Sequence, residues 1–240
     1  MGKLLKLVRR IFIAAAIVLV IVGGILGLIN YRRDCLMHPT VAYSGSGDTR
    51  IICVGDSITY GQGTFWTRRW NSYEAKLSKI LGDDYTIVNY GYSNRNVIST
   101  GIRPYIIEDY YEQSLAEDAD IVIIMLGTND TKACNWDEDL FENEYRAFVQ
   151  SYIDMDSNPD VYVMIPPVIY KEPEEDRDCD EVCLEQNVIP AIERVIEDTG
   201  VGRIDLFTLT EGHENWYSDG LHPNGYGNEK IAEAIAEVIQ

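Results

Sequence analysis

The apolar residues of this chain form one long uninterrupted run, followed by several short ones. Residues 11–29 are all apolar or glycine and carry no charge. A helix of this length rises far enough to cross about 30 Å of hydrocarbon, whereas a core helix would show a polar face. The pattern therefore predicts a transmembrane anchor within residues 1–33. Residues 34–49 contain Pro, Ser and Gly without periodicity, which predicts a linker.

Beyond the linker, short apolar runs alternate with amphipathic stretches. The apolar runs predict strands at 50–55, 85–91, 120–127, 160–167 and 202–207. Helical periodicity predicts helices at about 71–81, 103–117, 137–153, 181–199 and 224–239. Strands that are apolar on both faces and separated by helices indicate a parallel sheet covered on each side. Residues 50–240 are thus predicted to form one α/β domain with about five strands.

The flanks of the long apolar run bear on whether it is cleaved. A basic segment precedes it, formed by Lys3, Lys6, Arg9 and Arg10. Signal peptides begin in this way, but their apolar core usually spans about 7 to 15 residues and ends at small residues. This run is longer and does not end at small residues. Basic residues ahead of the span also favour a cytoplasmic amino terminus. We therefore expect a single-pass cell-membrane protein with an extracytoplasmic domain, with secretion after signal cleavage as the alternative.

Charge separates the two parts of the chain. The formal net charge is −19 at pH 7, and the first 33 residues contribute six basic and no acidic side chains, which leaves −25 on the remainder. A domain this acidic is repelled by phosphate backbones. We expect no nucleic-acid partner, and nothing in the chain indicates an oligomeric state.

The five cysteines matter because disulfides form in exported proteins. Cys53 falls within the first predicted strand and is expected to be a small core residue, and Cys35 follows the anchor. Cys134, Cys179 and Cys183 remain, and each follows a predicted strand. We expect two of these three to form a disulfide, with three free thiols as the alternative.

Polar residues follow the first three predicted strands. Gly55-Asp56-Ser57 ends the first, Asn94 comes soon after the second, and Gly127-Thr128-Asn129-Asp130 ends the third. The working surface of an open parallel sheet lies beyond the carboxyl ends of its strands. These residues are therefore expected at one edge of the sheet.

A serine at such an edge becomes a nucleophile only when a base takes its proton. Of the three histidines, His222 lies in a Gly- and Pro-rich turn with Asp219 three residues before it. That spacing lets the carboxylate fold back onto the ring nitrogen that faces away from the serine, which fixes the tautomer. Ser57, His222 and Asp219 are the candidate catalytic residues.

Together these blocks resemble the SGNH hydrolases, the family of GDSL-type serine esterases. The resemblance rests on Gly55-Asp56-Ser57-Ile58-Thr59, Gly127-Thr128-Asn129-Asp130 and Asp219-Gly220-Leu221-His222-Pro223, in that order, and spans about residues 50–240. It implies a flavodoxin-like three-layer α/β/α sandwich. It also implies that Ser57 is the nucleophile, His222 the general base and acid, and Asp219 the residue that orients the histidine.

The same resemblance implies an oxyanion hole made by the main-chain N–H of Ser57, the Asn129 carboxamide and a main-chain N–H in the second block. The family usually has glycine at this last position, and here it is Asn94. Asparagine is the next residue after glycine to accept an unusual backbone conformation. Asn94 is therefore still expected to donate, although its side chain restricts the space for an acyl group.

The chemistry needs no metal and no organic cofactor, and no histidine pair stands at ligand spacing. Aromatic residues near the catalytic blocks are candidate substrate contacts: Tyr60, Trp66, Trp216 and Tyr217. Exposed aromatic rings stack on sugars, and no apolar segment suggests a lid or an acyl tunnel. We expect an esterase that removes small acyl groups, chiefly acetyl, from carbohydrates. The alternatives are a lysophospholipase or thioesterase acting on lipid esters, and a non-catalytic glycan-binding module.

Overall fold

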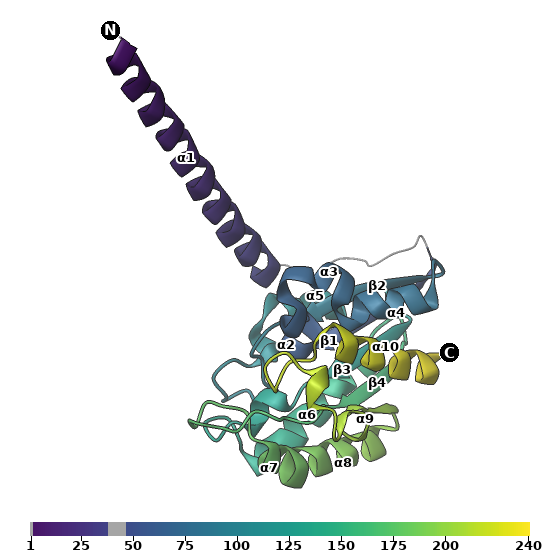
Figure 1. Ribbon diagram of the computed structural model, residues 1–240. Coiled ribbons are helices and arrows are strands. Elements are labelled where there is room, and N and C mark those ends of the chain that lie inside the picture. The colour runs from purple at the N-terminus through teal and green to yellow at the C-terminus, as the bar shows by residue number, and fades with distance from the viewer. Residues whose placement is uncertain (1, 38–46) are drawn as a thin grey trace. The chain divides into compact units, whose positions relative to one another are not determined.

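The computed structural model describes residues 2–37 and 47–240, and the chain divides into two compact units at residues 38 and 39 (Figure 1). The first unit contains one helix, α1 (Gly2–Met37). Its segment Val8–Ile29 is long and apolar enough to cross a membrane. Transmembrane anchors and signal sequences share these properties.

Helix α1 extends beyond the predicted end of the anchor at residue 33. The helix ends at Met37 and so includes residues 34–37 of the predicted linker. The rest of the predicted linker up to residue 46 lies outside the described residues.

The second unit is built on a sheet of five parallel strands in the order β2-β1-β3-β4-β5, which confirms the predicted α/β fold. The strands are β1 (Thr49–Gly55), β2 (Tyr85–Gly91), β3 (Ile121–Met125), β4 (Asp160–Ile165) and β5 (Gly202–Asp205). Gly55 at the end of β1 pairs with Gly91 of β2 and with Met125 of β3. The three strands β2, β1 and β3 thus end side by side, and the segments that follow them emerge at one edge.

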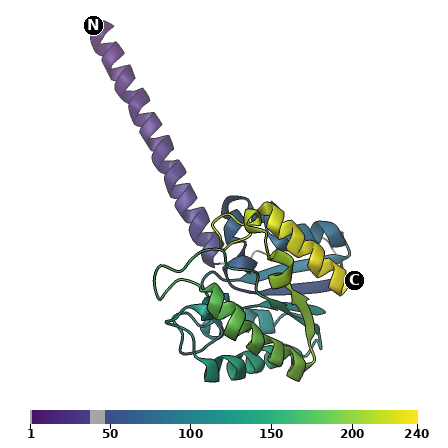
Figure 2. The same cartoon turned by 60° about the horizontal axis from the view of Figure 1, so that its bottom comes forward.

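Helices cover both faces of this sheet (Figures 1 and 2). The longer ones are α4 (Tyr73–Leu81), α5 (Asp109–Leu115), α6 (Glu138–Ile153), α8 (Ile189–Thr199) and α10 (Gly225–Ile239). The shorter segments are α2 (Ser57–Tyr60), η1 (Gln62–Thr67), α3 (Arg68–Asn71), η2 (Tyr105–Ile107), η3 (Thr128–Thr131), α7 (Glu181–Cys183), the π-helical η4 (Leu184–Val188), α9 (Leu206–Thr210) and η5 (Glu214–Trp216).

Strand alternation divides the core into two clusters. Ile52 and Val54 point to the face covered by α5, α6 and α8, whereas Ile51 and Cys53 point to the face covered by α4 and α10. Successive side chains of a strand point to opposite faces, so a strand that is apolar throughout serves both clusters. The result is the three-layer sandwich that the resemblance implied.

Several predicted elements are shorter than expected, and local structure explains two of them. The helix expected at 103–117 is α5, preceded by the short η2, because Pro104 and an extended Glu108 interrupt it. The strand expected at 202–207 ends at Asp205. The Asp205 carboxylate accepts a hydrogen bond from Thr208 N and so caps the start of α9. A side-chain cap of this kind competes with continuation of the strand.

Candidate active site

Ser57 begins helix α2 directly after strand β1. Asp56 caps the helix by accepting a hydrogen bond from Ile58 N at 2.9 Å. A Cβ added at Gly55 would lie 2.3 Å from Thr59 Oγ1 and 2.5 Å from Met125 O, so only glycine fits before the turn. These constraints fix Ser57 at the carboxyl edge of the sheet, where it is 8% exposed.

The turn that contains His222, residues 219–222, brings its imidazole to this serine. His222 Nε2 lies 3.0 Å from Ser57 Oγ, and His222 Nδ1 lies 2.8 Å from Asp219 Oδ2. The other carboxylate oxygen, Asp219 Oδ1, accepts hydrogen bonds from the main-chain N–H groups of Leu221 and His222. We call residues 219–222 the histidine loop. Its hydrogen bonds form a continuous path from carboxylate to imidazole to hydroxyl.

The charge of Asp219 is stabilised in this loop. Partial burial acts to raise the pKa of Asp219, but the hydrogen bonds from the His222 ring and from the main-chain N–H groups outweigh it and hold that pKa well below its usual range. A carboxylate that stays ionised favours the imidazolium form of the neighbouring ring. The arrangement thus suits a histidine that takes a proton from Ser57.

Asn94 follows strand β2 in a left-handed conformation with φ of 68°. The neighbouring chain is tied to η3 and to the residues after it. Val97 N donates to Asp130 Oδ1 at 2.9 Å, and Ile98 N donates to the same oxygen at 3.1 Å. The side chain of Lys132 donates to Asn94 Oδ1. We call residues 93–98 the oxyanion loop, after the role that the resemblance implies for Asn94.

The Asn129 side chain lies at the same edge, but its amide hydrogens already have partners. Asn129 Nδ2 donates to Asp56 Oδ2 at 3.1 Å and to the main-chain oxygen of Arg95 at 3.0 Å. A carboxamide has only two N–H groups. To donate to an oxyanion as well, Asn129 must share one of these hydrogen bonds.

Two buried carboxylates organise this side of the site, and sequence reasoning assigned them no role. Burial raises the pKa of Asp56 to about 6, although the Ile58 N–H and the charges of His222 and Lys132 act against it. Burial likewise raises the pKa of Asp130 to about 7 against the N–H groups of Val97 and Ile98. Both residues belong to the sequence blocks that resemble the SGNH hydrolases, and this position was the signal that could have identified them.

Asn135 and Lys132 also hold this region, and no sequence pattern pointed to them. Asn135 Nδ2 donates to the main-chain oxygen of Asn129 at 2.8 Å, and Asn135 Oδ1 accepts from Ile102 N at 2.9 Å. The contacts to Ile102 and to Asn94 join segments that are distant in the chain. These two contacts form only when the strands are in register, so the sequence alone does not indicate them.

The four aromatic candidates for substrate contact divide into two pairs. Tyr60 and Tyr217 are buried, the first beneath the Arg68 guanidinium and the second against Tyr170, so their rings expose little surface in this structure. Trp66 is 60% exposed. Trp216 is half-buried and stacks on His213 with ring centroids 3.9 Å apart.

The expected disulfide is not formed, since Cys134, Cys179 and Cys183 are all free thiols. The buried Cys179 Sγ faces Asn129 Oδ1 at 4.0 Å, whereas Cys134 is exposed and lies near Asn135 Oδ1. Sequence position alone placed these cysteines at one end of the sheet, but their side chains face different partners.

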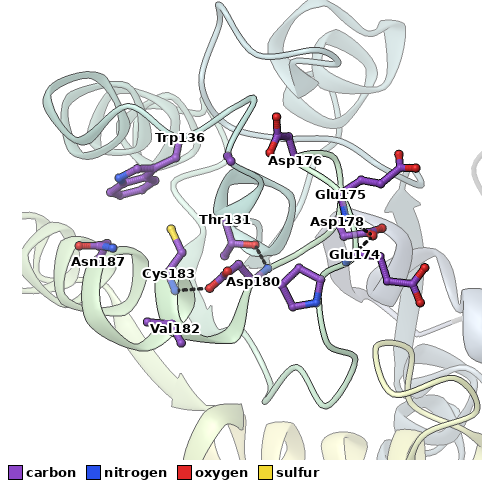
Figure 3. Close-up of a pocket in the computed structure, with 12 residues that line it drawn as sticks. Thr131, Trp136, Glu174, Glu175, Asp176, Asp178, Asp180, Val182, Cys183 and Asn187 are labelled. Carbon is purple, nitrogen blue, oxygen red and sulfur yellow. Dashed lines mark hydrogen bonds between the residues drawn. The ribbon is translucent and has the colours of Figure 1, made fainter.

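An open cavity of about 630 Å³ lies beside η3 (Figure 3). Thr131, Trp136 and Cys183 line it together with acidic residues of the segment 174–180. Asp180 N donates to Thr131 Oγ1 at 3.0 Å and so joins the cavity wall to η3. No three His, Cys, Asp or Glu side chains within the described ranges are grouped to hold a metal ion.

Comparison with known proteins gives one family. The GDSL-like Lipase/Acylhydrolase family matches residues 53–230. An acetylxylan esterase from Xylanibacter ruminicola is 30% identical over 213 residues, which is 80% of this chain and 43% of that protein. This chain therefore spans less than half the length of that relative.

Solved structures share the fold. A carbohydrate acetylesterase from Sinorhizobium meliloti superposes with a TM-score of 0.63 at 21% identity, covering 79% of this chain and 97% of that one. A variant of an acetyl-xylooligosaccharide esterase from Geobacillus gives 0.60 at 20% identity, covering 80% and 94%. With the family match and the geometry above, the chain belongs to the GDSL-like lipase/acylhydrolase family, the SGNH hydrolases.

Proposed function

We propose that this protein removes small acyl groups, chiefly acetyl, from carbohydrate esters through the triad Ser57, His222 and Asp219. The observation that supports the triad is the pair of contacts at His222, 3.0 Å to Ser57 Oγ and 2.8 Å to Asp219 Oδ2. Both distances lie within the range for proton transfer and for orientation of the ring. Ser57 is distant in the sequence from His222 and Asp219, and these two residues share an exposed turn. Packing of a core therefore does not explain why the three side chains meet.

In the proposed reaction, Ser57 Oγ attacks the ester carbonyl while His222 Nε2 takes its proton. The tetrahedral intermediate collapses as the imidazolium returns that proton to the leaving alcohol, which leaves the acyl group on Ser57. Water, deprotonated by His222, then attacks the acyl carbonyl, and the acid is released as Ser57 regains its proton. Asp219 stays ionised and stabilises the imidazolium in both halves.

The oxyanion of each intermediate accepts hydrogen bonds from the main-chain N–H groups of Ser57 and Asn94 and from Asn129. Donors of this kind commonly contribute about 3 kcal/mol each to transition-state stabilisation. Asn129 contributes by sharing an N–H that Asp56 or Arg95 holds in the resting enzyme. Asp56 thereby keeps the carboxamide aimed at the site between turnovers.

Acetylated carbohydrate is the substrate class that relatives and residues favour together. The relatives described above include esterases whose names refer to acetylxylan and to carbohydrate. In this chain Asn94 stands at the position that is usually glycine in the family, and we expect its side chain to restrict the space for an acyl group. Trp66 offers an exposed ring beside α2 on which a sugar can stack.

We also propose that α1 remains as a membrane anchor with the catalytic unit outside the cytoplasm. The length and composition of Val8–Ile29 support this. Recovery of the full-length protein in membranes after a carbonate wash is the expected result. A shortened form in the medium would show instead that the helix is a cleaved signal sequence.

The catalytic proposal is tested on the full-length protein in detergent, with Ser57→Ala as the matched variant. We expect a fluorophosphonate probe to label the native protein and not the variant. Acetyl esters should be hydrolysed faster than longer acyl esters, and acetate should be released from acetylated xylan. Faster turnover of long-chain esters would favour lipid substrates, and absence of Ser57-dependent labelling would favour a binding module.

A further inference from the structure

Lys132 contacts Asn94 although 38 positions separate them in the chain. Lys132 follows η3 directly, and its main-chain oxygen accepts hydrogen bonds from Asn135 N at 2.8 Å and Trp136 N at 2.9 Å. The backbone that bears the ammonium group is therefore fixed. From this position the Lys132 side chain donates to Asn94 Oδ1.

The backbone conformation of Asn94 is costlier for asparagine than for glycine. At φ of 68° the Cβ of a non-glycine residue crowds its own main chain. A short polar side chain offsets the cost when it forms a hydrogen bond. The hydrogen bond from Lys132 is available only while the Asn94 side chain points toward η3.

The remaining anchors of the oxyanion loop hold the residues on either side of Asn94. Arg95 Nη1 donates to the main-chain oxygen of Ser93 at 2.9 Å, and Asn129 Nδ2 donates to that of Arg95. Asp130 holds Val97 and Ile98. Residue 94 itself is held through its side chain, and Lys132 is the group that holds it.

The charge on Lys132 stays directed at this site. Among the described residues no carboxylate lies within ion-pair distance of its ammonium group, in contrast to Arg95, which pairs with Glu108 at 2.7 Å. Lys132 is half-buried, which weakens screening by water. Its ammonium group thus lies on the same side of the site as the oxyanion loop.

We propose that Lys132 is a positioning residue of the oxyanion hole, which holds the Asn94 carboxamide so that the Asn94 main-chain N–H points at the oxyanion formed on Ser57. This inference rests on the proposed function and deepens it. In this chain a lysine–asparagine pair does what the backbone freedom of glycine does in the usual family pattern. Neither residue does so alone.

The test compares Lys132→Met, Asn94→Gly and the double variant in the full-length protein, with acetyl ester hydrolysis as the readout. We expect Lys132→Met to lower kcat about tenfold with KM changed less than twofold. The reason is that the variant weakens the hydrogen bond from the Asn94 N–H to the oxyanion, which forms only in the transition state. Glycine needs no side-chain contact at residue 94, so the double variant should match Asn94→Gly within about twofold. Lys230→Met, on the surface of α10, is the matched control and should keep native kcat.

Equal losses from Lys132→Met in the native protein and in the Asn94→Gly variant would overturn the positioning role, as would native kcat in Lys132→Met. Lys132→Leu, which also lacks a hydrogen-bond donor, replaces Lys132→Met if the latter does not fold. Crystal structures give a readout that is independent of activity: we expect Asn94 to leave positive φ in Lys132→Met, and retention of φ near 68° would overturn the inference. If the native protein lacks Ser57-dependent labelling, the proposed function fails, and the structures still decide the role of Lys132.

Discussion

The histidine loop and the oxyanion loop both use a carboxylate to hold main-chain N–H groups, but in different surroundings. Asp219 binds the N–H groups of residues two and three positions ahead, and its side chain is 53% exposed. Asp130 is fully buried and binds the N–H groups of Val97 and Ile98, 33 and 32 positions away. Asp219 thus holds its own loop, whereas Asp130 holds a loop that is distant from it in the sequence.

Because of this difference, the carboxylates of the two loops contribute in different proportions to catalysis and to the stability of the fold. In the histidine loop partial burial is outweighed by hydrogen bonds, which lower the pKa of the Asp219 carboxyl, so folding favours its ionised form, and the exposure of the side chain keeps this stabilisation modest. Beside the oxyanion loop, burial raises the pKa of Asp56 and of Asp130, because a charged carboxylate is costly away from water. We therefore expect changes in the first loop to affect turnover and changes around the second to affect folding as well.

The largest expected effect tests the histidine loop at its ring. His222→Ala should lower kcat about 10⁴-fold, because no other base reaches Ser57 Oγ among the described residues. His213→Ala is the matched control, since His213 is exposed and stacked on Trp216. Kinetics on an acetyl ester measure both variants, and similar losses in the two would contradict the assignment of the base.

Removal of the exposed carboxylate should affect turnover far more than stability. Asp219→Ala is expected to lower kcat about 10³-fold by releasing the orientation of His222. Its free energy of unfolding should fall by only about 1 kcal/mol, because water can replace the carboxylate at the exposed N–H groups of Leu221 and His222. Urea unfolding measured beside the kinetics tests this, and a large loss of stability would erase the contrast between the loops.

Removal of the buried carboxylate should lower stability. Asp130→Ala leaves the N–H groups of Val97 and Ile98 buried without partners, which should cost about 3 kcal/mol. Asp156→Ala, at an exposed aspartate, is the control and should lie within about 0.5 kcal/mol of native. Urea unfolding of both variants is the measurement, and equal stabilities would mean that water replaces the carboxylate in the oxyanion loop.

The smallest expected effect is a pH dependence of stability from a further buried carboxylate, Glu74 of α4. Burial raises the pKa of Glu74 from 4.5 to about 8, so the folded protein binds this proton more tightly than the unfolded chain. The contribution is complete below pH 4.5 and is lost as the pH rises toward 8. Asp56 and Asp130 act with the same sign.

Glu74→Gln should therefore reduce the fall in unfolding free energy between about pH 5 and about pH 8 by about 1 kcal/mol, since relaxation and partial hydration moderate the cost of a buried charge. Urea unfolding at the two pH values compares it with native protein and with Glu112→Gln, which alters an exposed side chain. An unchanged difference between the two pH values would show that Glu74 does not titrate in this window.

Much of the fold followed from local patterns. The strand predicted at 85–91 has the bounds of β2, and the helix predicted at 224–239 differs from α10 by one residue. Strands buried on both faces have an unmistakable apolar pattern. The helix expected at 103–117 was less accurate, because the extended residue Glu108 divides a stretch whose periodicity continues across it.

The candidate site was predictable where its partners are close in sequence. Asp219 and His222 are three residues apart in a tight turn, so their hydrogen bond could be anticipated from spacing. Burial of Tyr60 and Tyr217 could not, since aromatic residues beside a site occur both as exposed platforms and as packing. Their partners, Arg68 and Tyr170, gave no signal in the sequence.

The sequence by itself determined the strand pattern, the apolar amino-terminal segment, the family and the residues that supply the candidate nucleophile and base. Only the tertiary structure decided that Asn129 has both amide hydrogens engaged, that Asp130 holds the oxyanion loop and that Lys132 reaches Asn94. The reason is physical: apolar periodicity and short turns are properties of neighbouring residues, whereas these hydrogen bonds join segments that meet only when parallel strands set their register.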